Sequence, residues 1–274
     1  MNLSRLDLDG VGSPLAIASR IHELAPSMPL AVPIEQLCGQ LDIGSITQIE
    51  TSAFEAALVM DEFKARGSIL LAANRMPERQ RYSLGHELGH FLIPSHRPSV
   101  DHPFQCSLAD FHLLDERDRD RHRRVEAEAN RFAAHLLMPP ARVRQLIRQT
   151  ASSLESIVAM AHEFKVSKEA MARAWVDANR NSTAVVILHN RHIQRCYRAE
   201  DFPWIAGMKG ERVSAVSVAA SSHQSGTYSE IEEVDPETWL CERDAKRTLE
   251  LTEQVLFQRD GYALVLLQIE FDDD

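Results

Sequence analysis

The sequence lacks the features that would direct a chain out of the cytoplasm or into a membrane. Its four cysteines have no paired spacing, which is typical of a reducing compartment rather than of a disulfide framework. The first residues, Met1–Arg5, contain no basic segment followed by an apolar one, so we expect no secretory signal. The longest apolar runs, such as Tyr262–Leu267, have the length of a strand, so we expect a cytoplasmic protein without a membrane contact.

Positive charge is also scarce. The chain has 30 Lys and Arg against 40 Asp and Glu, a net charge of −10, which argues against a basic footprint for nucleic acid over the whole chain. One local run is basic and contains Arg117, Arg119, Arg121, Arg123 and Arg124. Such a run is either a solvated surface or a contact for an anion or a single nucleic-acid strand. The length allows one large domain or two modest ones.

The most informative segment is residues 86–90, which read His-Glu-Leu-Gly-His. On a helix, His86 and His90 project from one face, at a spacing that one divalent metal ion can bridge. Glu87 is then placed to reach a metal-bound water rather than the metal itself. This arrangement predicts a zinc hydrolase in which Glu87 is the general base.

Two glycines interrupt the same predicted helix. Gly85 and Gly89 each cost about 1 kcal/mol relative to alanine in a helix, so a plain structural helix would avoid them. Glycine has no Cβ atom, and it therefore lets another backbone or a substrate pack close.

A catalytic zinc site needs a third protein ligand, and we look for it in the segment 125–135. This segment is helical by composition and has an apolar stripe that must face the core. Glu126 and Asn130 lie four residues apart beside that stripe, where a carboxylate is costly unless it is paired or bound to metal. We therefore predict Glu126 as a ligand and Asn130 as a hydrogen-bond partner of a ligand imidazole. Glu128 is the alternative ligand, about 200° away around the helix.

The remaining pattern predicts an α+β protein with three parts. Residues 1–140 should form a minimal zinc-peptidase domain, in which a small antiparallel or mixed sheet runs directly into the His-Glu-Leu-Gly-His helix. Residues 141–180 resemble a helix-turn-helix, with a scaffold or docking role favoured over DNA reading because few of its residues are basic. Residues 181–274 change to a strand-rich α/β texture, with strands expected at 184–188, 213–218 and 263–269.

Two long segments together resemble one known family. Residues 81–90, Arg-Tyr-Ser-Leu-Gly-His-Glu-Leu-Gly-His, and residues 126–139, from Glu126 to Pro139, look like the ImmA/IrrE family of zinc metallopeptidases, over roughly residues 15–140. The family pattern places its third metal ligand at Glu126. His135 departs from it, because family members often carry an acidic residue there.

The resemblance implies a cytoplasmic zinc endopeptidase with a thermolysin-like minimal domain. Such an enzyme cleaves a helix-turn-helix, XRE-like repressor and so derepresses stress, DNA-damage or phage-related genes. Single-stranded DNA or a small molecule is the candidate activator, and IrrE-like relatives carry a GAF-like sensory domain where residues 181–274 lie. Two alternatives remain at this point: a non-catalytic regulator or sensor that contains zinc, and a peptidase of broad range.

Two features of the site stay open in the sequence. The group that stabilises the oxyanion is Tyr82, His112 or His135, with no order among them. Cys106 lies between the two ligand helices, where its thiolate can serve as a fourth zinc ligand that displaces the catalytic water. The alternative is that Cys106 is an ordinary cysteine of a loop.

Overall fold

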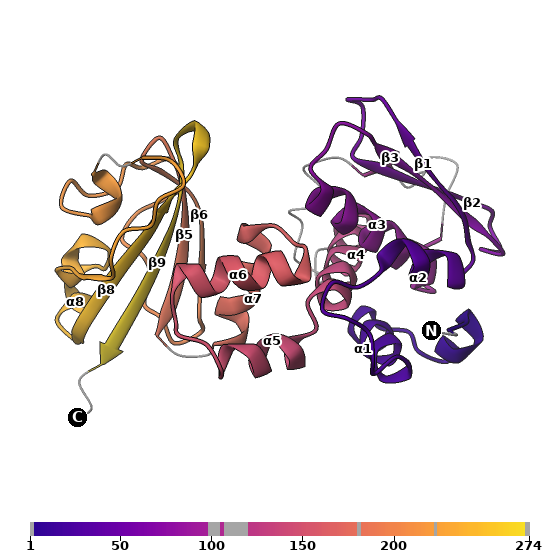
Figure 1. Ribbon diagram of the computed structural model, residues 1–274, viewed down its shortest axis with the longest axis horizontal. Helices are drawn as coiled ribbons and strands as arrows, with labels where there is room; N and C mark the ends of the chain where they lie inside the picture. The colour runs from indigo at the N-terminus through magenta and orange to yellow at the C-terminus, as the bar shows by residue number, and fades with distance from the viewer. Residues whose placement is uncertain (1–2, 98–104, 107–119, 180–181, 222–223, 272–274) are drawn as a thin grey trace. The chain divides into compact units, whose positions relative to one another are not determined.

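The computed structural model describes residues 3–97, 105–106, 120–179, 182–221 and 224–271 (Figure 1). It divides into two compact units, Met1–Pro139 with Glu163–Ser167, and Pro140–His162 with Lys168–Asp274. Most of the 141–180 segment therefore groups with the C-terminal strands, and the three-part domain division stays a prediction. Among the described residues, no helix is both long enough and apolar enough to cross a membrane.

Over its described residues, the N-terminal unit combines four α-helices with one sheet, so the chain has the expected α+β character. Its elements are α1 (Pro14–Leu24), α2 (Ile34–Gln40), β1 (Ile43–Ile49), β2 (Ala56–Met60), β3 (Gly67–Ala72), α3 (Pro77–Leu92), β4 (Gln105–Cys106) and α4 (Arg121–Leu137). The strand order is β1-β3-β2-β4. Strand β1 runs parallel to β3, while β2 runs antiparallel to both β3 and β4, so the sheet is mixed.

Helix α3 follows the β2–β3 hairpin after a short turn and packs against both strands (Figure 1). Its second half is buried almost completely, from Ser83 to Phe91. A helix that is buried on all sides needs small residues where its neighbours approach, because protein interiors are close-packed.

The two glycines of α3 face helix α4. A Cβ atom added at Gly89 would lie 2.9 Å from Cδ1 of Phe132 and 3.4 Å from the Cα atom of Ala129. A Cβ atom at Gly85 would lie 3.4 Å from Cβ of Ala133, which is ordinary contact. The glycines and the small residues of α4 therefore let the two helices approach closely, and the neighbour that packs against this glycine face is helix α4, through Phe132 and its alanines.

The C-terminal unit has a five-stranded antiparallel sheet flanked by helices. Its elements are α5 (Pro140–Ile147), α6 (Leu154–Phe164), α7 (Lys168–Ala178), β5 (Thr183–His189), β6 (His192–Arg198), β7 (Glu232–Glu233), α8 (Glu242–Ala245), β8 (Thr248–Phe257) and β9 (Tyr262–Phe271). The strand order is β6-β5-β9-β8-β7, and helix α7 packs on β5 and β6. Long buried runs in β5 and β9 form its centre. The GAF-like assignment stays a prediction.

The strand expected at 213–218 is absent, and this prediction was wrong. The segment instead ends in a short 3-10 helix, Val218–Ala220. The cause is Glu253 of β8, which is fully buried and accepts hydrogen bonds from the Ser217 hydroxyl at 2.7 Å and from the Ala219 amide at 3.0 Å. A buried carboxylate requires such donors, so the backbone turns toward Glu253 rather than pairing with a strand.

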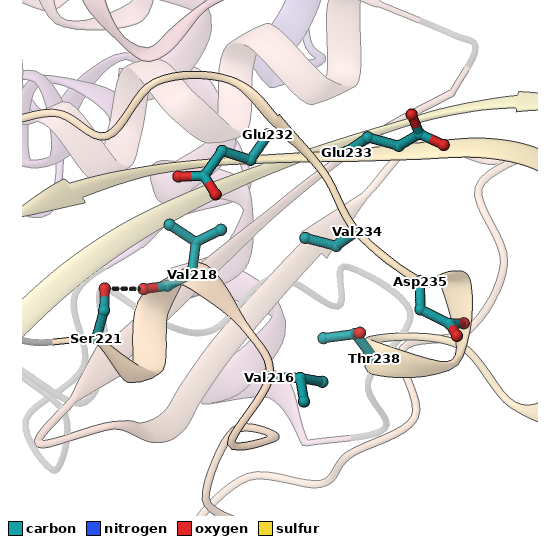
Figure 2. A pocket seen from close by; sticks show the side chains of 8 residues that line it. All are labelled: Val216, Val218, Ser221, Glu232, Glu233, Val234, Asp235 and Thr238. Atoms are coloured by element: carbon teal, nitrogen blue, oxygen red, sulfur yellow. Dashed lines mark hydrogen bonds between the residues drawn. The ribbon is translucent and has the colours of Figure 1, made fainter.

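A cavity of about 530 Å³ lies in this C-terminal unit (Figure 2). Three carboxylates line it, those of Glu232, Glu233 and Asp235, together with valines and two hydroxyl residues. Such an acidic lining repels phosphate groups, so this cavity does not suit a single nucleic-acid strand.

The glycine contact predicts opposite effects for two matched substitutions. Gly89→Ala should lower the free energy of unfolding by roughly 1–3 kcal/mol, because the buried Phe132 side chain must move to admit a methyl group. Gly85→Ala should be neutral or stabilising by up to about 1 kcal/mol, since alanine favours the helix and its Cβ atom would make only ordinary contacts. Urea unfolding of the two variants measures this difference, and equal effects would contradict the account.

Candidate metal centre

The N-terminal end of α3 is fixed by a buried carboxylate. Glu55 accepts hydrogen bonds from Nε of Arg75 at 2.7 Å and from Nε of Arg79 at 3.3 Å. Pro77 occupies the first turn, where its missing N–H costs nothing. The first turn of the helix is thus tied to the chain just before β2.

The C-terminal end of α3 is capped by a lysine from the β2–β3 connection. The Nζ atom of Lys64 donates to the carbonyl oxygens of His90 at 2.9 Å, Phe91 at 3.3 Å and Ile93 at 2.8 Å. Burial lowers the pKa of Lys64 to about 8, with smaller contributions from Arg5 and Arg97. The ammonium group thus binds carbonyls of the last turn and complements the helix dipole.

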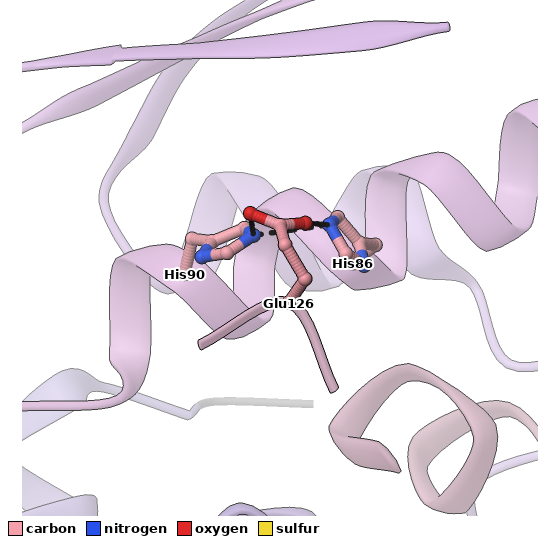
Figure 3. Close-up of side chains that lie close together, drawn as sticks. All are labelled: His86, His90 and Glu126. Atoms are coloured by element: carbon pink, nitrogen blue, oxygen red, sulfur yellow. Dashed lines mark hydrogen bonds and ion pairs between the residues drawn. The ribbon is translucent and has the colours of Figure 1, made fainter. Parts of the chain in front are cut away.

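Three side chains converge where α3 meets α4 (Figure 3). The Nε2 atoms of His86 and His90 are 3.0 Å apart. Glu126 of α4 places Oε2 at 3.1 Å from the first and Oε1 at 3.4 Å from the second. All three residues are buried, and their potential ligand atoms lie within 4.8 Å of one another. Two imidazoles and a carboxylate are the donor set of many catalytic zinc sites, so these residues fit a metal ion.

Asn130 contacts the ring nitrogen of His86 that does not face the cluster. Its Oδ1 atom lies 2.9 Å from Nδ1 of His86 and accepts a hydrogen bond from the Tyr82 hydroxyl at 3.1 Å. Because an amide oxygen only accepts, Nδ1 of His86 carries a proton, and its Nε2 atom faces the cluster. This is the contact for which the sequence analysis selected Asn130.

The charges of the cluster are strongly coupled. Burial acts to raise the pKa of Glu126, but the neighbouring His90 and His86 outweigh it, and the pKa falls below its usual range. Burial likewise acts to lower the pKa of His86, yet the hydrogen bond and charge of Glu126 raise it. Burial lowers the pKa of His90 to about 3. The carboxylate of Glu126 and the imidazole of His86 thus favour each other's charged form, and a metal ion bound here would compete with protons.

Glu87 is fully buried beside the cluster, close enough for its charge to raise the pKa of His86. It follows His86 on the helix, so it points to a different side from the two ligand histidines. It is absent from the three-residue metal cluster found among the described residues. The role of Glu87 as general base therefore stays a prediction.

The structure also shows two histidines near the site that sequence reasoning missed. His96 is buried, and it lies between His90 and Glu128, at 3.1 Å from Nδ1 of the first and 2.8 Å from Oε2 of the second. Glu128 is therefore directed to His96 and not to the cluster. His122 lies at the edge, with Nε2 3.9 Å from Oε1 of Glu126. His96 was hidden in a polar segment after Pro94, and its burial was the only signal that could have found it.

Other residues named from the sequence lie away from the cluster or outside the described residues. His135 uses Nδ1 to contact the carbonyl of Arg131 in its own helix, at 3.1 Å. His112, Arg117 and Arg119 fall outside the described residues. Cys106 forms strand β4 through its backbone, paired with Ala56, but its side chain is outside the description, so its role stays a prediction.

Comparison with known proteins agrees with this geometry. A family model described as the IrrE N-terminal-like domain, a peptidase family, matches residues 46–175. Residues 46–175 belong to the ImmA/IrrE family. This match starts later than the resemblance seen in the sequence, and it ends within α7. The family assignment therefore identifies a peptidase domain that contains both ligand helices.

The fold also resembles a solved structure. A "Mycobacterium tuberculosis transcriptional regulator" matches with a TM-score of 0.53 and 14% identity, over 93% of this chain and 75% of that one. At this identity the likeness concerns the fold alone. A comparison with curated proteins finds no match.

The cluster predicts that zinc affinity depends on Glu126. Glu126→Gln removes the negative charge but keeps the shape, so it should weaken zinc binding by more than the 10–100-fold that is typical of a residue outside the ligand set. Competition with a chromophoric chelator measures this. Glu23→Gln is the matched control, because Glu23 is on the surface of α1 with its side chain 65% exposed. Equal zinc affinities in the two variants would show that Glu126 is not a ligand.

Proposed function

We propose that this protein is a zinc-dependent endopeptidase that cleaves a helix-turn-helix, XRE-like repressor. The observation that carries this proposal is the buried cluster of His86, His90 and Glu126 with Glu87 beside it. A structural metal site needs four protein ligands and no base, whereas a catalytic site keeps a position open and a base nearby. Membership of a peptidase family supports the same reading.

In the proposed reaction, His86, His90 and Glu126 hold the zinc ion. When bound, zinc lowers the pKa of a water molecule toward about 7 and polarises the scissile carbonyl. Glu87 would accept a proton from the attacking water and deliver it to the leaving amine. Asn130 keeps the imidazole of His86 in the tautomer that exposes Nε2.

The substrate proposal rests on the family and on one neighbour. The ImmA/IrrE resemblance implies a repressor as substrate, and the structural neighbour is titled a transcriptional regulator. That title also favours the second candidate, a regulator that contains zinc and does not cleave. The two candidates differ in one observable result: the endopeptidase produces a cleaved repressor, and the non-catalytic regulator does not.

Activation is the other part of the proposal. Single-stranded DNA or a small molecule remains the proposed activator, with the C-terminal unit as the sensing part. The acidic cavity of this unit (Figure 2) favours a neutral or cationic small molecule over a nucleic acid at that position.

Cleavage should depend on Glu87 and not only on zinc. The zinc-loaded chain, incubated with a helix-turn-helix repressor encoded beside it, should yield two fragments by mass spectrometry. Glu87→Gln should bind zinc as tightly as the parent but cleave at least about 100-fold more slowly, because the general base is lost. A Glu87→Gln variant that cleaves normally would refute the mechanism. An intact repressor under all activating conditions would favour the non-catalytic regulator.

The proposed inhibition by Cys106 gives a separate prediction. If Cys106 is an inhibitory fourth ligand, Cys106→Ala should cleave the repressor without any activator, because the water position is then open. Cys196→Ala is the control, since Cys196 is an exposed cysteine of the C-terminal unit. A Cys106→Ala variant that still requires the activator to the same extent would remove Cys106 from the proposal.

A further inference from the structure

His96 connects one histidine of the cluster to a carboxylate of α4. Its Nδ1 atom lies 3.1 Å from Nδ1 of His90, and its Nε2 atom lies 2.8 Å from Oε2 of Glu128. His96 is fully buried, whereas the Glu128 side chain is 22% exposed. A series of contacts therefore runs from the partly exposed Glu128 through His96 to the imidazole ring of His90, a candidate metal ligand.

The order of donors along this chain follows from the carboxylate. An ionised carboxylate only accepts, so Nε2 of His96 must donate to Glu128. A neutral imidazole with its proton on Nε2 has a lone pair on Nδ1, and this lone pair accepts from Nδ1–H of His90. His90 then has its own lone pair on Nε2, the atom that faces His86 and Glu126.

We propose that His96 and Glu128 are positioning residues, which hold His90 in the orientation and tautomer needed to bind the metal ion and increase its basicity. This inference rests on the proposed metal site. A histidine ligand whose second nitrogen donates to a carboxylate or other acceptor is a stronger and better oriented ligand. Here the carboxylate of Glu128 does not contact His90 directly; the imidazole of His96 lies between them.

The two ligand histidines are supported by different chemistry. His86 contacts an amide, Asn130, whereas His90 contacts a histidine that is backed by a carboxylate. Glu128, the alternative ligand in the sequence, thus acquires a role on the opposite flank of α4 from Glu126. The same helix supplies the third ligand, the amide and the carboxylate, because the three side chains project at different angles from neighbouring turns.

The test is zinc affinity in the full chain, measured by chelator competition at constant pH. Glu128→Gln and His96→Leu should each weaken zinc binding about 10–100-fold. His96→Asn should lose less than His96→Leu, because its amide oxygen can still accept from Nδ1–H of His90. Glu23→Gln, an exposed carboxylate of the same unit, should leave the affinity unchanged. The visible spectrum of the cobalt-loaded chain should change in Glu128→Gln and not in Glu23→Gln.

The outcomes separate this inference from the proposed function. Unchanged zinc affinity and an unchanged cobalt spectrum in a folded Glu128→Gln variant overturn the positioning role of His96 and Glu128. This holds even if the parent cleaves a repressor in a Glu87-dependent manner. If the two variants bind zinc more weakly but the parent protein cleaves nothing, the result supports the positioning role and contradicts the peptidase proposal. Equal losses for His96→Asn and His96→Leu overturn the acceptor role of Nδ1. If His96→Leu does not fold, the isosteric Glu128→Gln variant decides.

Discussion

The close contact between α3 and α4 is the constraint on which the site depends. Gly89 has no room for a Cβ atom against the Phe132 side chain, so α4 approaches α3 more closely than a larger residue at this position would allow. The glycines cost about 1 kcal/mol each in helix propensity. In return, the carboxylate of Glu126 reaches both imidazoles of the neighbouring helix. A wider spacing would leave the two histidines with an incomplete ligand set.

The ends of α3 explain why this contact can position side chains accurately. The buried carboxylate of Glu55, held by Arg75 and Arg79, fixes the first turn, and the ammonium of Lys64 binds the last carbonyls. A binding site built on a helix that is fixed at both ends needs little reorganisation when a ligand arrives. Asn130 contacts the imidazole of His86, and His96 contacts that of His90, so the rotation of each ring is restricted as well.

The parts that the sequence predicted were those with local periodicity. The spacing of His86 and His90, and the position of Glu126 beside an apolar stripe, follow from the 3.6-residue helical repeat alone. The missed parts depend on contacts between distant residues. Strand β8 was overlooked because Glu253 and Gln254 interrupt its apolar pattern, although both are buried. The burial of His96 likewise depends on α4, which follows it by more than twenty residues.

The central claim is that the glycine-mediated helix contact creates one zinc site with two imidazole ligands and one carboxylate. X-ray absorption at the zinc edge of the loaded full chain tests it most directly. The account predicts two imidazole rings with Zn–N distances of about 2.0–2.1 Å and an oxygen donor at about 2.0–2.2 Å. It further predicts that Glu126→Gln loses this oxygen shell. A spectrum with fewer than two imidazoles, or one that Glu126→Gln leaves unchanged, would contradict it.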